Sequence, residues 1–273
     1  MVAVLLLASG AGGAMEYHDE AGKSEMSPEV SVSRSAGGWR LVWDDEFDGA
    51  AIDRTKWNVR DDEARDTDLG CNVDDPANAF VADGTLTLRV LPKTVDCGGH
   101  PRHYTEPYLD TRGKASWTYG RFEIRAASPN HGPNDSQGLW PAFWMRPDGG
   151  GNGEIDVVEL PGGARWYDRA TAAIFWDYTP VKQDVRFGIR NGFPGDGFHT
   201  YAVEWDPNSL RWYVDGALVW TRDRTTTPWF GKAFGSDYHL RLNFQVGGWL
   251  GDPAASTAFP ADFLVDYVRV YQR

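Results

Sequence analysis

The chain has 273 residues, a formal net charge of −12 and only two cysteines, but 13 tryptophans, 11 tyrosines and 13 phenylalanines. This acidity excludes a general nucleic-acid binder, which needs a basic surface. Two cysteines are too few for a disulfide-rich scaffold or a four-cysteine zinc site. Charged residues at 24% and hydrophobic residues at 41% are typical of a globular protein. Thirteen tryptophans indicate a large aromatic core or a flat binding surface.

The N-terminal segment differs from the rest of the chain. Residues 1–14 carry no charge and contain a seven-residue apolar run, which predicts a signal peptide cleaved near Ala14 and therefore a secreted protein. The run is too short to span a bilayer, and a disordered apolar tail is the alternative. Residues 15–38 are acidic and rich in Ser and Gly, which predicts a disordered linker. We expect one folded domain over residues 39–273, which contain all the tryptophans.

Strand patterns dominate the expected domain, and helical periodicity is almost absent. In chain order, the predicted strands are Arg40–Phe47, Phe80–Val81, Thr85–Val90, Trp117–Ala127, Ala142–Met145, Glu154–Leu160, Thr171–Trp176, Phe198–Trp205, Leu210–Val214, Ala217–Thr221, His239–Val246 and Phe263–Tyr271. Asp215-Gly216 is a strong hairpin signal, and Asp53–Trp57 fits a single helical turn. Many strands with frequent turns predict an antiparallel sandwich or barrel.

The segment GEIDVVEL, residues 153–160, carries the most chemical information. In a regular strand Glu154 and Asp156 share one face, whereas Glu159 falls on the opposite face with the apolar side chains. Burying Glu159 among apolar side chains would be costly. A β-bulge at Val157-Val158 would return Glu159 to the polar face, and bulges are common beside active sites.

Such a bulge gives the two glutamates a geometry suited to catalysis. Leaning inward, their carboxylates would lie about 5 Å apart, the separation found in retaining glycosidases. Asp156 between them would raise the proton affinity of the cluster and orient a neighbour by a hydrogen bond. Taken alone, the pattern E-x-D-x-x-E is equally compatible with an ordinary acidic strand face.

Seven motifs lie around this segment in a fixed order. They are YGRFE at 119–123, LWPAFWM at 139–145, EIDVVE at 154–159, FHTYAVEW at 198–205, WYVDG at 212–216, VGG at 246–248 and VDYVRVY at 265–271. Together they resemble glycoside hydrolase family 16, and within it the laminarinase-like group of endo-β-1,3-glucanases. The resemblance covers roughly residues 40–273 and implies an all-β, concanavalin A-like jelly roll. Its two antiparallel sheets would form a concave substrate cleft.

The resemblance implies a role for each of the three acids. Glu154 would be the nucleophile of a retaining endo-glycosidase, Glu159 the general acid/base, and Asp156 an assistant to the nucleophile. Trp140 and Trp144 match a tryptophan pair that binds sugar near the cleavage site, although core packing is an alternative for Trp144. No cofactor is expected for catalysis, and the partner would be a polysaccharide bound by a monomer with no membrane attachment.

Two substrate-binding positions depart from the family pattern. Phe175 stands where many laminarinase-like members have a histidine, and Tyr108 where many have an arginine. A lost polar contact can change discrimination between sugars. β-1,3-Glucan is therefore the leading substrate, with a galactanase-type hydrolase or a transglycosylase as alternatives. A lectin-like binding domain is the alternative from another class, but it would not need all three acids.

Two further sites are expected outside the cleft. The resemblance implies a structural calcium held by Glu46, the backbone of Gly84 and Asp266, and oxygen ligands of this kind suit that ion. Cys71 and Cys97 lie in loop-like sequence. In a secreted protein they would pair as a disulfide, with free thiols as the alternative.

Overall fold

The computed structural model describes residues 38–65, 67–177 and 181–273. The predicted signal peptide, and the predicted linker except for Gly38, lie outside the described residues. Strands dominate the described chain, and its helices are limited to α1 (Phe230–Ala233) and the 3-10 turn η1 (Gly248–Leu250). No helix of this part is long and apolar enough to cross a membrane.

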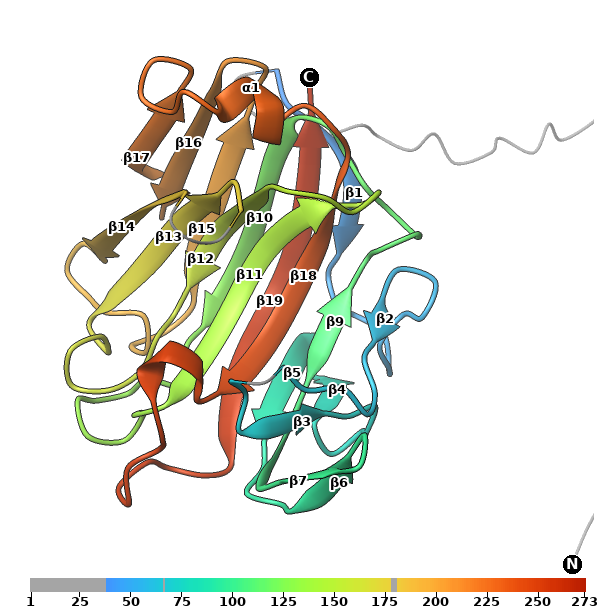
Figure 1. The fold of residues 1–273 in the computed structure, drawn as a ribbon, viewed down its shortest axis with the longest axis vertical. Coiled ribbons are helices and arrows are strands. Elements are labelled where there is room, and N and C mark those ends of the chain that lie inside the picture. The colour runs from blue at the N-terminus through green and yellow to red at the C-terminus, as the bar shows by residue number, and fades with distance from the viewer. Residues whose placement is uncertain (1–37, 66, 178–180) are drawn as a thin grey trace, which may run out of the picture. The chain divides into compact units, whose positions relative to one another are not determined.

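The first large sheet carries both ends of the domain (Figure 1). In spatial order it contains β17 (Ala217–Asp223), β16 (Ser209–Val214), β15 (His199–Trp205), β10 (Gly120–Ala127), β19 (Ala261–Gln272), β5 (Thr85–Val90) and β4 (Ala79–Ala82). β1 (Arg40–Asp45) also pairs with the long final strand β19. All these pairings are antiparallel.

The second large sheet is also antiparallel and packs on the first. Its spatial order is β14 (Lys182–Gly188), β13 (Arg169–Phe175), β12 (Glu154–Glu159), β11 (Leu139–Pro147), β18 (Tyr238–Val246), β9 (Tyr108–Asp110) and β2 (Asn58–Val59). Two small pairs complete the strands: β3 (Gly70–Asn72) with β8 (Tyr104–Glu106), and β6 (Val95–Cys97) with β7 (His100–Arg102). The two large sheets form the predicted jelly-roll sandwich.

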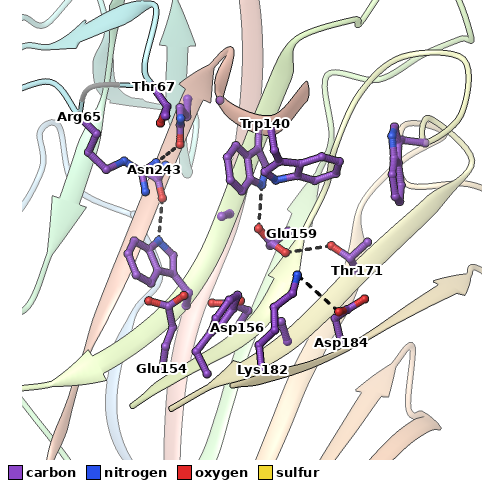
Figure 2. A pocket seen from close by; sticks show the side chains of 18 of the residues that line it. Arg65, Thr67, Trp140, Glu154, Asp156, Glu159, Thr171, Lys182, Asp184 and Asn243 are labelled. Atoms are coloured by element: carbon purple, nitrogen blue, oxygen red, sulfur yellow. Dashed lines mark hydrogen bonds and ion pairs between the residues drawn. The ribbon is translucent and has the colours of Figure 1, made fainter. Parts of the chain in front are cut away.

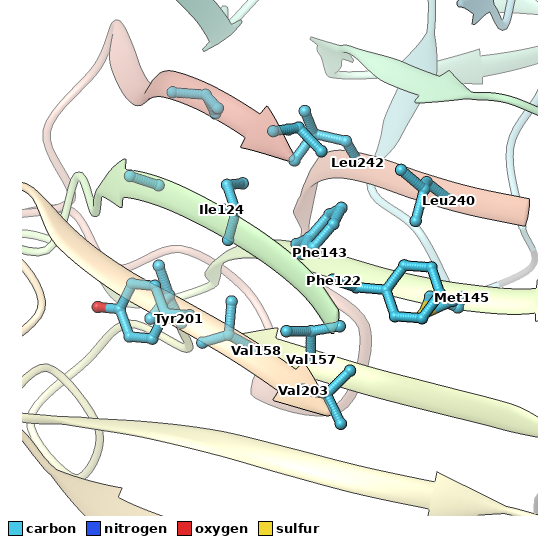
Figure 3. Packing of buried hydrophobic residues seen from close by; sticks show 14 of the residues in the cluster. Phe122, Ile124, Phe143, Met145, Val157, Val158, Tyr201, Val203, Leu240 and Leu242 are labelled. Atoms are coloured by element: carbon cyan, nitrogen blue, oxygen red, sulfur yellow. The ribbon is translucent and has the colours of Figure 1, made fainter. Parts of the chain in front are cut away.

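The hydrophobic core lies between the two large sheets (Figure 3). Phe122 of β10 and Tyr201 of β15 meet Phe143 of β11 and Leu242 of β18 there, and all four are fully buried. Strand periodicity explains this, because alternate side chains of each strand point into the sandwich. The remaining face of the seven-stranded sheet is left for polar and aromatic side chains.

The sequence predicts the central strands but misses β14 and the short strands β2, β3, β6, β7, β8 and β9. β14 is an edge strand in which exposed charged residues alternate with half-buried ones. Charged residues are typical of edge strands and weaken the apolar signal used for prediction. The predicted turn at Asp53–Trp57 is present, with the amide of Trp57 donating to the carbonyl of Asp53 at 2.9 Å.

Candidate active site

An open cleft of about 800 Å³ lies on the seven-stranded sheet, on the face turned away from the core. Its floor is formed by β11, β12, β13, β14 and β18, and η1 borders one end. Figure 2 shows the predicted acids Glu154, Asp156 and Glu159 side by side in this cleft, with Trp140 above them. The structure therefore brings the three acids and the tryptophan together.

A β-bulge in β12 places the acids on one face, as the sequence predicts. Phe143 of β11 is opposite Val158, but the next residue, Trp144, is opposite Asp156, so Val157 is the extra residue. The register with β13 shifts over the same stretch. Both valines are buried in the core, and Glu159 points into the cleft.

Glu154 is held at the buried end of the acid row. Only 6% of the residue is exposed, and Nη1 of Arg146 lies 3.2 Å from its Oε2. Burial, together with the charge of Glu159, raises the pKa of Glu154 to about 7, and Arg146 opposes this rise. Arg146 thus favours the ionised form that a nucleophile needs.

Glu159 accepts two hydrogen bonds at the other end of the row. The indole N–H of Trp140 donates to Oε1 at 2.9 Å, and the hydroxyl of Thr171 on β13 donates to Oε2 at 3.0 Å. Burial raises the pKa of Glu159, and both hydrogen bonds oppose that rise. The carboxyl group is therefore fixed in position while remaining able to bind a proton.

Asp156 lies between the two glutamates and is only 3% exposed. Burial, and then the charges of Glu154 and Glu159, hold the pKa of Asp156 well above its ordinary value. Three carboxyl groups so close in a buried row titrate together rather than singly. The row can therefore hold a proton near neutral pH.

The tryptophans form the aromatic wall of the cleft. Trp144 lines the cleft and donates its indole N–H to Oδ1 of Asn243 at 2.7 Å. The ring of Trp249 lies edge-on to Trp140 at 5.4 Å and to Trp166 at 5.0 Å. Trp249 is half exposed, which is unusual for so large an apolar side chain and suits an aromatic surface for sugar rings.

One glycine allows this wall to pack closely. Gly248, in the VGG motif, has a φ of +62°, and a Cβ there would lie 2.8 Å from the Trp140 ring. The side chain of any other residue would displace that ring.

The two departures from the family pattern have different positions. Phe175 lines the cleft and is the cross-strand partner of Glu154. Tyr108 is not among the cleft-lining residues, contrary to the prediction. Its ring lies 6.3 Å from Trp144, edge-on, with the guanidinium of Arg60 at 5.4 Å. Tyr108 therefore supports Trp144 instead of reaching the cleft.

Sequence reasoning missed Arg65, Arg146, Thr171, Trp166, Trp249 and the charged residues of β14. Each belongs to the site through strand register or loop position rather than through a motif. A signal was available for the two tryptophans, because Trp166 and Trp249 lie in glycine-rich loops where an apolar core side chain is not expected.

The predicted calcium ligands are engaged by arginines. Oε1 and Oε2 of Glu46 each lie 2.7 Å from the guanidinium of Arg269, and Oδ2 of Asp266 lies 2.6 Å from Arg125. Gly84 lies in a turn with a φ of +71°. Two carboxylates already neutralised by arginine do not offer calcium the free oxygens it requires. In this arrangement the three residues do not fit the ion.

The two cysteines are joined by a disulfide. Cys71 of β3 and Cys97 of β6 are both buried, with their Cα atoms 5.7 Å apart. The bond links the two small strand pairs that lie beside the seven-stranded sheet (Figure 1).

Paired carboxylates in an aromatic cleft of a jelly roll define a glycoside hydrolase. Residues 72–269 match the model of the glycosyl hydrolases family 16, and the chain belongs to that family. It is 37% identical over 271 residues to a beta-glucanase of Rhodothermus marinus, covering 88% of this chain and 87% of that protein. It is 32% identical over 258 residues to a glucan endo-1,3-beta-glucosidase of Cryptopygus antarcticus, covering 85% and 92%. The solved laminarinase of Rhodothermus marinus superposes with a TM-score of 0.72 at 35% identity, covering 86% of this chain and 97% of that one.

Proposed function

We propose that the protein is a retaining endo-glycosidase that hydrolyses internal β-1,3 linkages of a glucan of the laminarin type. The observation that carries this proposal is the bulge in β12, which brings Glu154, Asp156 and Glu159 to one face of an open cleft. A cleft open along its length accommodates the middle of a polymer, which suits endo-action.

The proposed mechanism has two steps. Glu154 attacks the anomeric carbon while Glu159 gives its proton to the leaving glycosidic oxygen, forming a covalent glycosyl-enzyme. Glu159 then removes a proton from water, which attacks the same carbon and releases Glu154 with the β configuration restored. Asp156 supports Glu154 by holding a proton within the acid row.

The Glu154→Ser variant tests the nucleophile. We expect turnover to be abolished with an unchanged melting temperature, and an exposed-acid variant, Glu63→Ser, to keep full activity. A proton-NMR time course with the wild-type protein should show the β product first. Retained turnover in Glu154→Ser, or an α product appearing first, would overturn the assignment.

The choice of polymer needs a panel of substrates. We expect reducing sugar to be released fastest from laminarin, because the relatives from Rhodothermus marinus and Cryptopygus antarcticus are named as glucan hydrolases. Faster release from a galactan would favour the galactanase alternative. Products longer than the starting substrate would favour the transglycosylase alternative. Binding without any release would favour a lectin-like protein.

A chelator should leave the melting temperature unchanged, because arginines already pair with Glu46 and Asp266. A lower melting temperature would instead favour a calcium site.

We also propose that the protein is secreted. The disulfide supports an oxidising compartment and therefore secretion. Mass spectrometry of the exported protein should find a mature N-terminus near residue 15, and size-exclusion chromatography should show a monomer.

A further inference from the structure

The acid row of β12 faces a row of charged residues on β14, two strands away. Strand register connects Asp156 to Asp184 through Ala173, and Glu154 to Lys182 through Phe175. In the same way, Thr171 connects Glu159 to Arg186. Side chains that pair across strands point to the same face. Adjacent strands are ~4.8 Å apart, so the β14 backbone lies ~10 Å from β12, a gap that a lysine side chain can largely cross.

Lys182 and Asp184 form an ion pair on the wall of the cleft. The ammonium lies 3.6 Å from Oδ1 of Asp184 and 5.7 Å from the centre of the Phe175 ring. Figure 2 shows Lys182 extending into the cleft between Asp184 and the acid row. Arg186, the next charged residue of β14, turns away and stacks on Trp166 at 4.1 Å.

We propose that Lys182 and Asp184 are positioning residues for Glu159, which act across β13 and set the pH at which Glu159 gives up its proton. This inference rests on the proposed role of Glu159 as the acid/base. Beyond the burial that raises the pKa of Glu159, the charge of Lys182 lowers that pKa and the charge of Asp184 raises it. The two members of this ion pair therefore shift the pKa of Glu159 in opposite directions.

The other charged groups in and beside the cleft are Glu154 and Asp156 on the same strand, Arg146 on β11, Arg186 on β14, and Arg65 in the loop before β3. The three arginines have partners of their own. Arg146 contacts Glu154, Arg186 stacks on Trp166, and Arg65 donates to Asp68. Lys182 and Asp184 remain as the pair whose charges can be removed without disturbing these contacts.

Substrate should strengthen the effect. The side chains of Lys182 and Asp184 are 45% and 50% exposed, so water and salt screen their charges in the free enzyme. A polysaccharide in the cleft excludes that water and lowers the local dielectric constant. The pH dependence of kcat reports the enzyme–substrate complex, whereas that of kcat/KM reports the free enzyme. Removing either charge should therefore shift the pH profile of kcat more than that of kcat/KM.

The test compares the alkaline limbs of the pH profiles of Lys182→Met and Asp184→Asn on laminarin. Lys182→Met should move the alkaline limb of the kcat profile to higher pH, and Asp184→Asn should move it to lower pH, each by about half a pH unit. The double variant should return towards the wild type, and 0.5 M salt should reduce both shifts. Arg169→Met, which removes an exposed cation of β13 paired with Asp168, should leave the profile unchanged.

Two outcomes would overturn the inference. If the alkaline limbs of the two single variants stay in place, or move in the same direction, Lys182 and Asp184 do not have opposite effects on Glu159. A change in KM alone would make the pair a sugar contact instead. Glu159→Gln separates this inference from the proposed function. If that variant stays fully active, the role of Glu159 fails. If it is inactive but the limbs do not move, only the role of Lys182 and Asp184 fails.

Discussion

At the scale of single residues, the reactivity of the site follows from burial opposed by a few specific contacts. Burial raises the pKa of all three acids. Arg146 acts against this at Glu154, and the donors Trp140 and Thr171 act against it at Glu159. The two ends of the row therefore differ in their partners, which supports the different roles proposed for Glu154 and Glu159.

Arg146→Met tests this separation. Removing the cation should raise the pKa of Glu154 above its value of about 7, so the proposed nucleophile would stay protonated up to a higher pH. We expect the acidic limb of kcat/KM to move to higher pH, with a larger loss of activity at pH 6 than at pH 8. An equal loss at both pH values would contradict this role, and Lys232→Met in α1 is the matched control.

The sequence predicts the acids but not their partners. The alternation in EIDVVE is enough to locate the acids and to require the bulge, because a buried Glu159 would be too costly. Arg146 lies eight residues before Glu154, and only the pairing of β11 with β12 brings them together. Register of this kind is set by tertiary contacts and cannot be read from one strand at a time.

At the scale of elements, a buried acid connects β8 to the end of β18, beside the cleft. Glu106, at the end of β8, is 2% exposed and accepts a hydrogen bond from the amide of Val246 at 2.8 Å. Gly70 leaves room for it, since a Cβ there would lie 2.3 Å from Oε2 of Glu106. Burial and the nearby charge of Asp68 raise the pKa of Glu106 to about 8. Asp68 in turn is bonded to Gln245, which lines the cleft.

Glu106→Gln should therefore change how stability depends on pH. In the unfolded chain Glu106 ionises near pH 4.5, whereas in the folded chain it keeps its proton up to about pH 8. Folding stability is lost as pH rises through this window, and the loss persists above it. The neutral variant should gain melting temperature over the wild type at pH 9 but not at pH 4. If the melting temperatures of the variant and the wild type change with pH in parallel, the pKa of Glu106 is not raised. Glu63→Gln, at an exposed glutamate, is the control.

Removing the disulfide should destabilise the same region. Cys71 and Cys97 are 26 residues apart, and closing a loop of this size stabilises by about 3 kcal/mol in the chain-entropy model. We expect the double variant Cys71→Ser, Cys97→Ser to melt at a lower temperature, with loss of activity limited to high temperature. A reductant should lower the melting temperature of the wild type and have no effect on the double variant.

At the scale of the whole molecule, the two sheets are connected at the catalytic bulge. Trp212, on β16 of the eight-stranded sheet, donates its indole N–H to the backbone carbonyl of Asp156 at 2.9 Å. A bulge interrupts the regular ladder, so this carbonyl needs a partner from elsewhere. The opposite sheet supplies it through the core.

Trp212→Phe tests this connection. The variant leaves the Asp156 carbonyl buried without its donor, at a cost on the order of 1–3 kcal/mol. We expect a lower melting temperature and also a lower kcat, because the bulge sets the direction of Asp156 and Glu159. Trp220→Phe makes the same change in a neighbouring ring, whose centre lies 4.4 Å from that of Trp212, and should lower kcat less. Equal losses of kcat in both variants would exclude a specific role for the bond.

The fold as a whole is more predictable than these connections. Alternating patterns such as LVDYVRVY place β19 and most central strands, because one face of each must be buried. The charged edge strand β14 escaped prediction because Val185 and Phe187 are its only apolar side chains and they alternate with exposed charges, which leaves a weak apolar signal. The site residues that β14 contributes were therefore missed with it.

The disulfide has a practical consequence for studying the cleft. The chain contains two cysteines in all, and both are bonded to each other, so the folded protein presents no thiol. A cysteine introduced on the cleft wall, for example in place of Trp249, would be the sole site of alkylation. Its labelling rate with and without oligosaccharide would report directly how much of the cleft each sugar covers.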